Sequence, residues 1–350
     1  MGKNSCILVF IFLYLYISGC KKSSEITPDN YFEPAMDKVL RDYPGAKVTV
    51  IDLDSIEPTP IKSEDHKIIS DSVSPKGKLF FSSPWAGTSF NGNIYLTDYQ
   101  QNCLFELKDG VIRRKIGRAG AAPLEFKEPY NIASNDSMLF IEDHGNGRIQ
   151  VLAKNLNYIF SIPSSFIYFA GDISASNNRL FITENNPSSA LVNVFWINHN
   201  QLKYITSIVP VIVVPPKQPF GVNALTFSVS SDSNFYFAYK TLPYILVYDS
   251  EYKLKSIFEL SGKDIEKIKS EKPAVLNGVK FIIRDIKITK DNKYIYVLLG
   301  STLIALKKTD SELKISKKYS LTNQPFKIAV DSSSVYLFDS FKARVDIIPN

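Results

Sequence analysis

The segment Leu139-Phe-Ile-Glu-Asp143-His-Gly-Asn-Gly-Arg148-Ile-Gln-Val-Leu152 contains the pattern that decides the fold. Two short runs of branched and aromatic residues flank a turn of His, Gly and Asn, and the first run ends in an aspartate. Runs of this length and composition favour β-strands, and Gly and Asn favour a tight turn between them. The segment therefore predicts a hairpin of two antiparallel strands.

This hairpin recurs along the chain. The first runs of its six copies begin between 41 and 59 residues apart, at 94–98, 139–143, 180–184, 235–239, 294–298 and 335–339. Most copies are followed by a third apolar run, and a strand before each hairpin makes four. A repeat of this length with four strands is typical of a propeller blade. We therefore expect an all-β, six-bladed β-propeller built from four-stranded antiparallel blades.

The last blade needs one more strand, because the sequence ends directly after its third run. The apolar segment 47–53 is unassigned, and we expect this N-terminal strand to complete the last blade and close the ring, which removes an exposed edge. Short helices are expected at 34–43 and 264–271, where apolar residues recur at helical spacing. The proline-rich segment 209–219 is expected to be an extended connector.

A glycine-rich loop precedes the second hairpin. Segment 117–126 ends in Phe, Pro129 opens the next strand, and the hairpin follows with its Asp143 and Arg148. This order resembles an NHL-type repeat, most specifically in this blade, partly in the first and last blades, and weakly in the third to fifth. Over roughly residues 45–350 the chain resembles the six-bladed propeller lipoproteins of Gram-negative bacteria.

Acidic residues that close the second strand of a blade can accept hydrogen bonds from backbone N–H groups of the turn. Asp143 and Arg148 are also placed to form a pair across their turn. We therefore expect a structural role for five turn residues, namely Asp98, Asp143, Arg148, Asp339 and Arg344.

The N-terminus predicts export. Lys3 precedes an uncharged apolar run at 7–17, which has the length of a signal-peptide core and is too short for a membrane span. The run ends in Ile17-Ser-Gly-Cys20, which resembles a bacterial lipoprotein box and implies lipid on the Cys20 sulfur. We expect a signal peptide at 1–19, a tether at 20–32 and the propeller at 33–350. An ordinary signal peptide and a short membrane helix are the alternatives.

The flanking sequence also bears on location and partners. Lys21-Lys22 lacks an acidic residue beside Cys20, and by resemblance to lipoprotein sorting we expect the periplasmic face of the outer membrane.

Residues 251–318 hold 16 Lys and Arg against 9 Asp and Glu. This excess predicts either a solvated lysine face or a patch for anionic lipid, acidic glycans or another envelope protein. A nucleic-acid partner is not expected for an exported chain. The remaining cysteine, Cys103, is expected to be buried.

Aligning the repeats places a polar residue at the start of most inner strands. These residues are Asn131, Asp172, Asn223, Arg284, Asp285 and Lys327, with Trp85 or Tyr130 near them. Since inner strands line the channel of a propeller, we expect the six to ring one mouth of it. They are either wet loop ends or a site for a small polar or acidic ligand.

Enzyme motifs are missing from the sequence, including phosphate loops, nucleophile elbows and paired zinc ligands. Three histidines, His66, His144 and His199, fall in segments that are not expected to converge. No cofactor is predicted, although carboxylates in the channel leave calcium open. The main hypothesis is a membrane-anchored, non-enzymatic binding or scaffolding propeller of the cell envelope. The alternative is a metal-dependent lyase or hydrolase with its site in the central channel.

Overall fold

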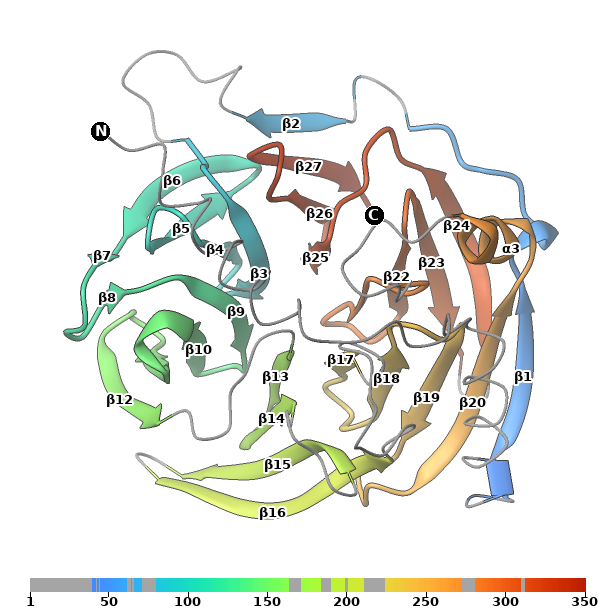
Figure 1. Ribbon diagram of the computed structural model, residues 1–350, viewed down its shortest axis with the longest axis horizontal. Helices are drawn as coiled ribbons and strands as arrows, with labels where there is room; N and C mark the ends of the chain where they lie inside the picture. The colour runs from blue at the N-terminus through green and yellow to red at the C-terminus, as the bar shows by residue number, and fades with distance from the viewer. Residues whose placement is uncertain are drawn as a thin grey trace, which may run out of the picture.

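The computed structural model describes residues 40–41, 43, 45–61, 64, 66–70, 80–163, 171–183, 190–198, 201–210, 224–271, 281–309 and 312–350. Six sheets, each containing four antiparallel strands, surround a common axis (Figure 1). In each sheet, three or four consecutive strands follow one another outward from the strand nearest the axis. The predicted six-bladed β-propeller is therefore confirmed.

The blades are numbered in chain order. Blade 1 contains β3 (Pro84–Phe90), β4 (Asn93–Asp98), β5 (Cys103–Lys108) and β6 (Val111–Ile116), and blade 2 contains β9 (Pro129–Ser134), β10 (Met138–Asp143), β11 (Arg148–Ala153) and β12 (Tyr158–Pro163). Blade 3 contains β13 (Ile173–Ser176), β14 (Arg179–Thr183), β15 (Ala190–Asn198) and β16 (Gln201–Pro210), and blade 4 contains β17 (Leu225–Val229), β18 (Phe235–Tyr239), β19 (Tyr244–Tyr248) and β20 (Leu254–Ser261). Blade 5 contains β21 (Asp285–Ile288), β22 (Tyr294–Leu299), β23 (Thr302–Lys308) and β24 (Leu313–Ser320), and blade 6 contains β25 (Lys327–Val330), β26 (Ser334–Asp339) and β27 (Arg344–Pro349).

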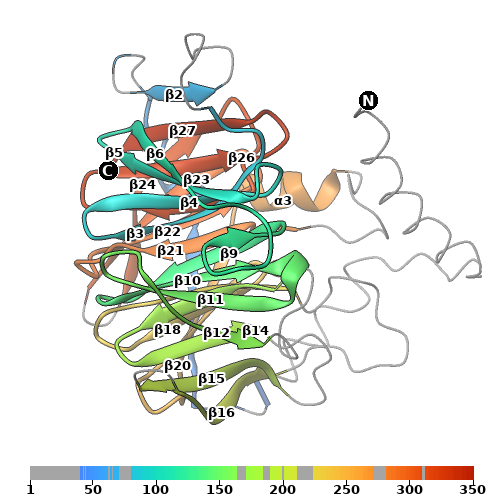
Figure 2. The ribbon, with the colours of Figure 1, turned by 90° about the vertical axis from the view of Figure 1, so that its left-hand side faces the viewer.

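The inner strands form a closed ring. Each one contacts the inner strand of the next blade, and β25 of blade 6 contacts β3 of blade 1. Blade 3 therefore faces blade 6 across the axis, and blade 2 faces blade 5. Figure 2 shows the resulting disc edge-on, with the helix α3 (Lys263–Ser270) projecting from one of its faces.

The core of the propeller is divided into six apolar clusters, one between each pair of neighbouring blades. Between blades 2 and 3, for example, Phe140 and Val151 pack with Ile182 and Phe195. Because both faces of every blade are covered in this way, most central strands are buried along nearly their whole length. This explains why the repeats are continuous apolar runs in the sequence.

The ring is closed by an N-terminal strand, as predicted, but the predicted segment is wrong. The fourth strand of blade 6 is β2 (Lys67–Ser70), which pairs antiparallel with β27. Segment 47–53 instead contains β1 (Lys47–Asp52), which pairs parallel with β20 as a fifth, outermost strand of blade 4. Ile51 and the following Leu53 are buried in the cluster between blades 4 and 5, and this burial fixes β1 there.

The predicted helix at 264–271 is confirmed as α3, one residue earlier. Its Ile265 packs into the same cluster as Ile51. Of the predicted helix at 34–43, Leu40 and Arg41 are helical and the rest lies outside the described residues, apart from Tyr43. In the predicted connector, Val209 and Pro210 end β16, and 211–219 lie outside the described residues.

Cys103 is buried as expected, and burial raises the pKa of its thiol to about 12. Cys20 and the segments expected to be the signal peptide and the tether lie outside the described residues. Within the described part of the chain, no helix has the length and apolar character needed to cross a membrane.

The glycine-rich loop forms a small parallel pair, β7 (Arg118–Ala119) with β8 (Glu125–Phe126). Gly117 has a φ of +82°, and a Cβ there would lie 2.5 Å from the ring of the buried Phe126. Short 3-10 turns occur after β1, as η2 (Leu53–Ser55), and between β10 and β11, as η4 (His144–Asn146).

The turn aspartates bind backbone on more than one side. Asp98 accepts hydrogen bonds from the N–H groups of Ser82 and Ser83 before β3 and of Gln101 in the following turn. Asp143 accepts from the N–H of Lys127 and from Arg148 Nε, each at 2.7 Å. These carboxylates connect the loop that leads into a blade with the hairpin of the same blade.

The last blade uses a different arrangement. Asp339 accepts a hydrogen bond from the N–H of Lys342 in its own turn. Arg344 pairs with Asp346, and His66 Nε2 lies 2.9 Å from the same carboxylate. This cluster joins β27 to the segment that leads into β2, where the ring closes.

Candidate functional site in the central channel

The two ends of the channel have different chemistry. Asp172, Asp285 and Lys327, at the starts of inner strands, meet at one end, which we call the charged end. Ser134, Ser176 and residues near the finish of other inner strands line a cavity at the other end, which we call the pocket end. All inner strands thus run along the axis in the same direction, from the charged end to the pocket end.

An ion pair crosses the axis at the charged end. Lys327 Nζ of blade 6 lies 2.8 Å from Asp172 Oδ2, just before β13 of blade 3, and 3.9 Å from Asp285 Oδ1 of blade 5. The Thr226 hydroxyl of blade 4 lies 3.1 Å from Asp172 and 2.6 Å from Asp285. The N–H of Ile328 donates to the other Asp285 oxygen at 2.8 Å. Four blades are therefore joined by one buried polar network.

The electrostatics of this network favour the charged forms. Burial raises the pKa of Asp172, but the ammonium groups of Lys327, Lys287 and Lys240 outweigh it and lower that pKa to about 2. Burial opposes the charge on Lys327, but Asp172 and Asp285 raise the pKa of this lysine. Lys240 differs, because burial and repulsion from Lys327 lower its pKa to about 8. Both shifts therefore favour the charged ion pair across the axis.

Asn131 lies beside this network. Its Nδ2 donates to Glu142 Oε2 at 2.6 Å and to the carbonyl of Gly171 at 2.9 Å, while its Oδ1 and Glu142 Oε1 accept no hydrogen bond within the described residues. His144 Nδ1 lies 3.4 Å from Glu142. The ring of Tyr130 lies 4.3 Å from that of Trp85, centroid to centroid. Sequence reasoning missed Glu142 and His144, although both are adjacent to the turn residue Asp143.

One of the predicted mouth residues, Arg284, is placed elsewhere. Arg284 donates to the carbonyls of Gln324 and Pro325 and lies over the ring of Phe326, so it fixes the loop before β25. Asn223 lies outside the described residues. The structure thus brings together Asp172, Asp285 and Lys327, places Asn131 beside them, and directs Arg284 to a neighbouring loop.

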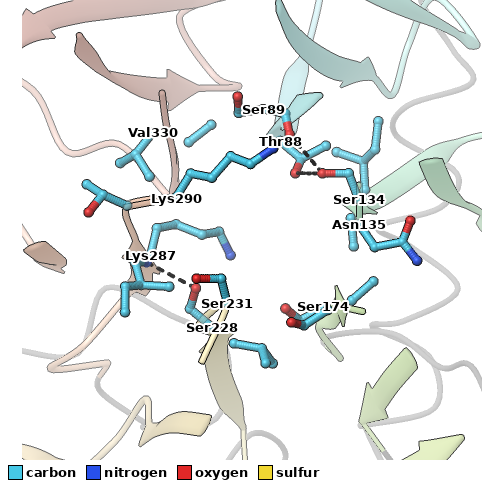
Figure 3. Close-up of a pocket in the computed structure, with 18 of the residues that line it drawn as sticks. Thr88, Ser89, Ser134, Asn135, Ser174, Ser228, Ser231, Lys287, Lys290 and Val330 are labelled. Carbon is cyan, nitrogen blue, oxygen red and sulfur yellow. Dashed lines mark hydrogen bonds between the residues drawn. The ribbon is translucent and has the colours of Figure 1, made fainter. Parts of the chain in front are cut away.

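The pocket end holds a cavity of about 170 Å³ (Figure 3). Its wall combines hydroxyl and amide groups, two lysines and an aspartate with small and branched apolar side chains. The residues labelled in Figure 3 come from all six blades: Thr88, Ser89, Ser134, Asn135, Ser174, Ser228, Ser231, Lys287, Lys290 and Val330. None of these residues was predicted. The available signal was a serine near the finish of the inner strands of blades 1 to 4, namely Ser89, Ser134, Ser176 and Ser228.

Hydrogen bonds fix much of this wall. The Ser134 hydroxyl lies 2.9 Å from that of Thr88 and donates to the carbonyl of Ser89 at 2.8 Å. Ser228 Oγ accepts from the N–H of Ile288 at 3.0 Å. Because these bonds join neighbouring blades, the shape of the pocket depends on the ring and not on a single loop.

The two lysines enter the pocket from blade 5 (Figure 3). Lys287 Nζ lies 3.5 Å from Asp285 Oδ1, so Lys287 connects the pocket end to the charged end. Lys290 Nζ lies 2.9 Å from Asp136 Oδ1 of blade 2, on the opposite side of the ring. This second cross-axis ion pair spans the pocket and is exposed, with 79% and 81% of the two side chains accessible.

Many lysines of the basic stretch 251–318 have acidic partners. Those in ion pairs are Lys253, Lys269, Lys287, Lys290, Lys293, Lys308, Lys314 and Lys318. Such pairing spreads the charge and is typical of a solvated surface. Docking of this stretch on acidic partners stays a prediction.

The channel offers no ligand set for a cation among the described residues. Within them, no three His, Cys, Asp or Glu side chains are grouped so that they could hold a metal ion. At the charged end, the ammonium of Lys327 lies between the carboxylates of Asp172 and Asp285, where a cation would bind. Calcium binding in the channel stays a prediction, and the described residues provide no ligand set for it.

The chain was compared with known proteins. No family model matches it, and no curated protein matches it. Among solved structures, a member of the DUF4221 family from Bacteroides vulgatus is 11% identical with a TM-score of 0.53, covering 83% of this chain and 97% of that chain. A protein of unknown function from Bacteroides thetaiotaomicron is 12% identical with a TM-score of 0.52, covering 78% of this chain and 70% of that one.

A streptogramin B lyase is 14% identical with a TM-score of 0.49, and the match covers 81% of this chain and 97% of the lyase. At such identities the similarity extends to the fold alone. The two structures with TM-scores above 0.5 therefore support the six-bladed propeller fold alone, and the function has to be argued from the channel.

Proposed function

We propose that this chain is a non-enzymatic binding propeller of the cell envelope, and that its pocket end binds a small polar or acidic ligand. The observation that carries the proposal is the 170 Å³ cavity, whose polar wall is assembled from separate blades. Concave sites with a few convergent polar groups on a rigid frame are typical of small-ligand binding. The cross-blade hydrogen bonds of Ser134 and Ser228 keep that wall in place without a ligand.

The charged end supports binding over catalysis. A metal-dependent lyase or hydrolase needs carboxylates that are available to a metal in the channel. Asp172 and Asp285 are instead engaged by Lys327, by Thr226 and by the N–H of Ile328. In this proposal the charged end is a structural brace that holds four blades together, and the pocket end is the functional surface.

The proposal includes export and lipid anchoring at Cys20, for which the sequence is the support. We propose the periplasmic face of the outer membrane, which is supported by the lack of an acidic residue beside Cys20 in Lys21-Lys22 and by the resemblance to Gram-negative lipoproteins. Acylation with several chains holds a protein at a bilayer almost permanently. A propeller tethered there would act at high local concentration, so weak ligand contacts suffice.

A ligand screen tests the binding proposal. The full-length chain, purified in detergent, is unfolded thermally with a panel of small polar and acidic compounds, because a ligand at a hundredfold excess over Kd adds about 2.7 kcal/mol of stability. The variant Ser174→Phe fills the pocket, whereas Ser250→Phe makes the same change in an exposed turn away from it. We expect some compounds to stabilise the parent chain and Ser250→Phe, and to have no effect on Ser174→Phe. Equal stabilisation of all three would place binding outside the pocket.

A further inference from the structure

We propose that the ligand of the pocket end carries an oxyanion, that is, a phosphate, sulfate or carboxylate group, which Lys287 and Lys290 bind. This inference rests on the proposed function and narrows it to one ligand chemistry. Ammonium groups form strong, charge-assisted hydrogen bonds with such groups.

The charge of the wall carries the inference. Among the residues that line the pocket, the ionisable ones are Lys287, Lys290 and Asp136. Two cations against one anion leave the wall with an excess of one positive charge. The remaining polar lining is hydroxyl and amide, so a ligand with the opposite charge balances the pocket and a cationic one is repelled.

Lys287 keeps donor capacity for a ligand. Its carboxylate neighbour, Asp285, lies at 3.5 Å and already accepts closer hydrogen bonds from Thr226 and the N–H of Ile328. An ammonium group has three donors, and this weak contact uses one of them. The Lys287 side chain is 20% accessible, so water screens its charge less than at an open surface.

Lys290 can be recruited from its present partner. It extends over the pocket toward Asp136 in an exposed ion pair, and exposed pairs contribute little stability. An oxyanion below it can therefore replace Asp136 as its partner. Removing the charge of Asp136 should free Lys290 and strengthen anion binding.

Hydroxyl donors complete the arrangement. Ser174 faces the pocket, where its hydroxyl can donate to a ligand (Figure 3). Ser228 accepts a backbone hydrogen bond, so its own proton is available to a ligand. The cavity has space for several water molecules, and a phosphate or sulfate group fits into such a volume.

The test uses isothermal titration of the full-length chain in detergent at low chloride. The probes are inorganic phosphate, sulfate and acetate, with glycerol as a neutral control. The variants are Lys287→Met, Asp136→Asn and Lys314→Met, the last of which loses an exposed lysine on the outer strand β24. We expect saturable binding of at least one anion, a loss of about tenfold or more in Lys287→Met, tighter binding in Asp136→Asn and no change in Lys314→Met.

Two results would overturn the inference. One is the absence of saturable binding by all three anions. The other is an anion affinity that changes no more in Lys287→Met and Asp136→Asn than in Lys314→Met. If a neutral compound from the screen bound in a manner sensitive to Ser174→Phe while the anions did not bind, the proposed function would stand and the oxyanion chemistry would be wrong. Should Lys287→Met fail to fold, Asp136→Asn decides alone, because Asp136 and its partner Lys290 are both exposed.

Discussion

Replacing Lys327 with methionine tests the brace at the charged end. Methionine keeps most of the length of the side chain but removes the cation between Asp172 and Asp285. The Lys327 side chain is 6% accessible and those of the two aspartates are 4% and 0% accessible, so water cannot replace the lost charge. Removing one partner of a buried ion pair typically costs about 3–5 kcal/mol. We expect a loss of unfolding free energy in that range.

The dependence of this loss on pH gives a second, independent signature. In the parent chain the pKa of Asp172 is lowered to about 2, so the group contributes stability above its unfolded pKa of about 3.9 and loses it as the pH falls toward 2. Without Lys327, burial dominates and should raise the folded pKa of Asp172. Such a group favours folding at low pH and loses that contribution as the pH rises. The deficit of the variant should therefore be smaller at about pH 5 than at pH 7.

Urea unfolding of the full-length chain, followed by intrinsic fluorescence at both pH values, measures the effect. Lys314→Met is the matched control, because it removes the same group from an exposed ion pair. The double variant Asp172→Asn with Lys327→Met should lose less stability than the two single changes added together. A loss in Lys327→Met no larger than in the control, or a deficit that grows on acidification, would refute the brace.

The remaining predictions concern the blades and the anchor. Arg148→Met should lower the unfolding free energy by about 3 kcal/mol, since Arg148 pairs with the buried Asp143 and also binds two loop carbonyls. The control Arg118→Met removes one partner of an exposed ion pair and should leave urea unfolding unchanged. Cys103 should resist a thiol reagent at about pH 8 in the folded chain and react in urea, because burial raises its pKa to about 12; rapid labelling before unfolding would contradict that burial. Cys20→Ala should remove labelled palmitate and release the chain from the membrane fraction, and a variant that stays in membranes would argue for another anchor.

The blades were predictable because each is a local pattern. A hairpin such as 139–152 is written in adjacent residues, and six copies leave few folds other than a propeller. Ring closure was not predictable in the same way. Segments 47–52 and 67–70 both favour strands, and the choice between them depends on contacts with β20 and β27, which are distant in sequence.

The channel was predictable in part. Alignment of the repeats predicted that Asp172, Asp285 and Lys327 lie at one end of the channel. It did not predict the ion pair across the axis, because that pair depends on the width of the ring. Arg284 precedes Asp285, and neighbouring residues of an extended chain point to opposite sides, so the two could not share one role. The pocket end was missed because the serine near the finish of four inner strands indicates a shared site only once the strands are arranged around the axis.

A crystal structure grown with a compound that stabilises the chain in the ligand screen tests the central claim most directly. We expect the compound to lie in the pocket end, with an acidic group near Lys287 and the hydroxyl of Ser174 facing it. A compound bound at the charged end, or on the outer surface of a blade with the pocket empty, would contradict the account.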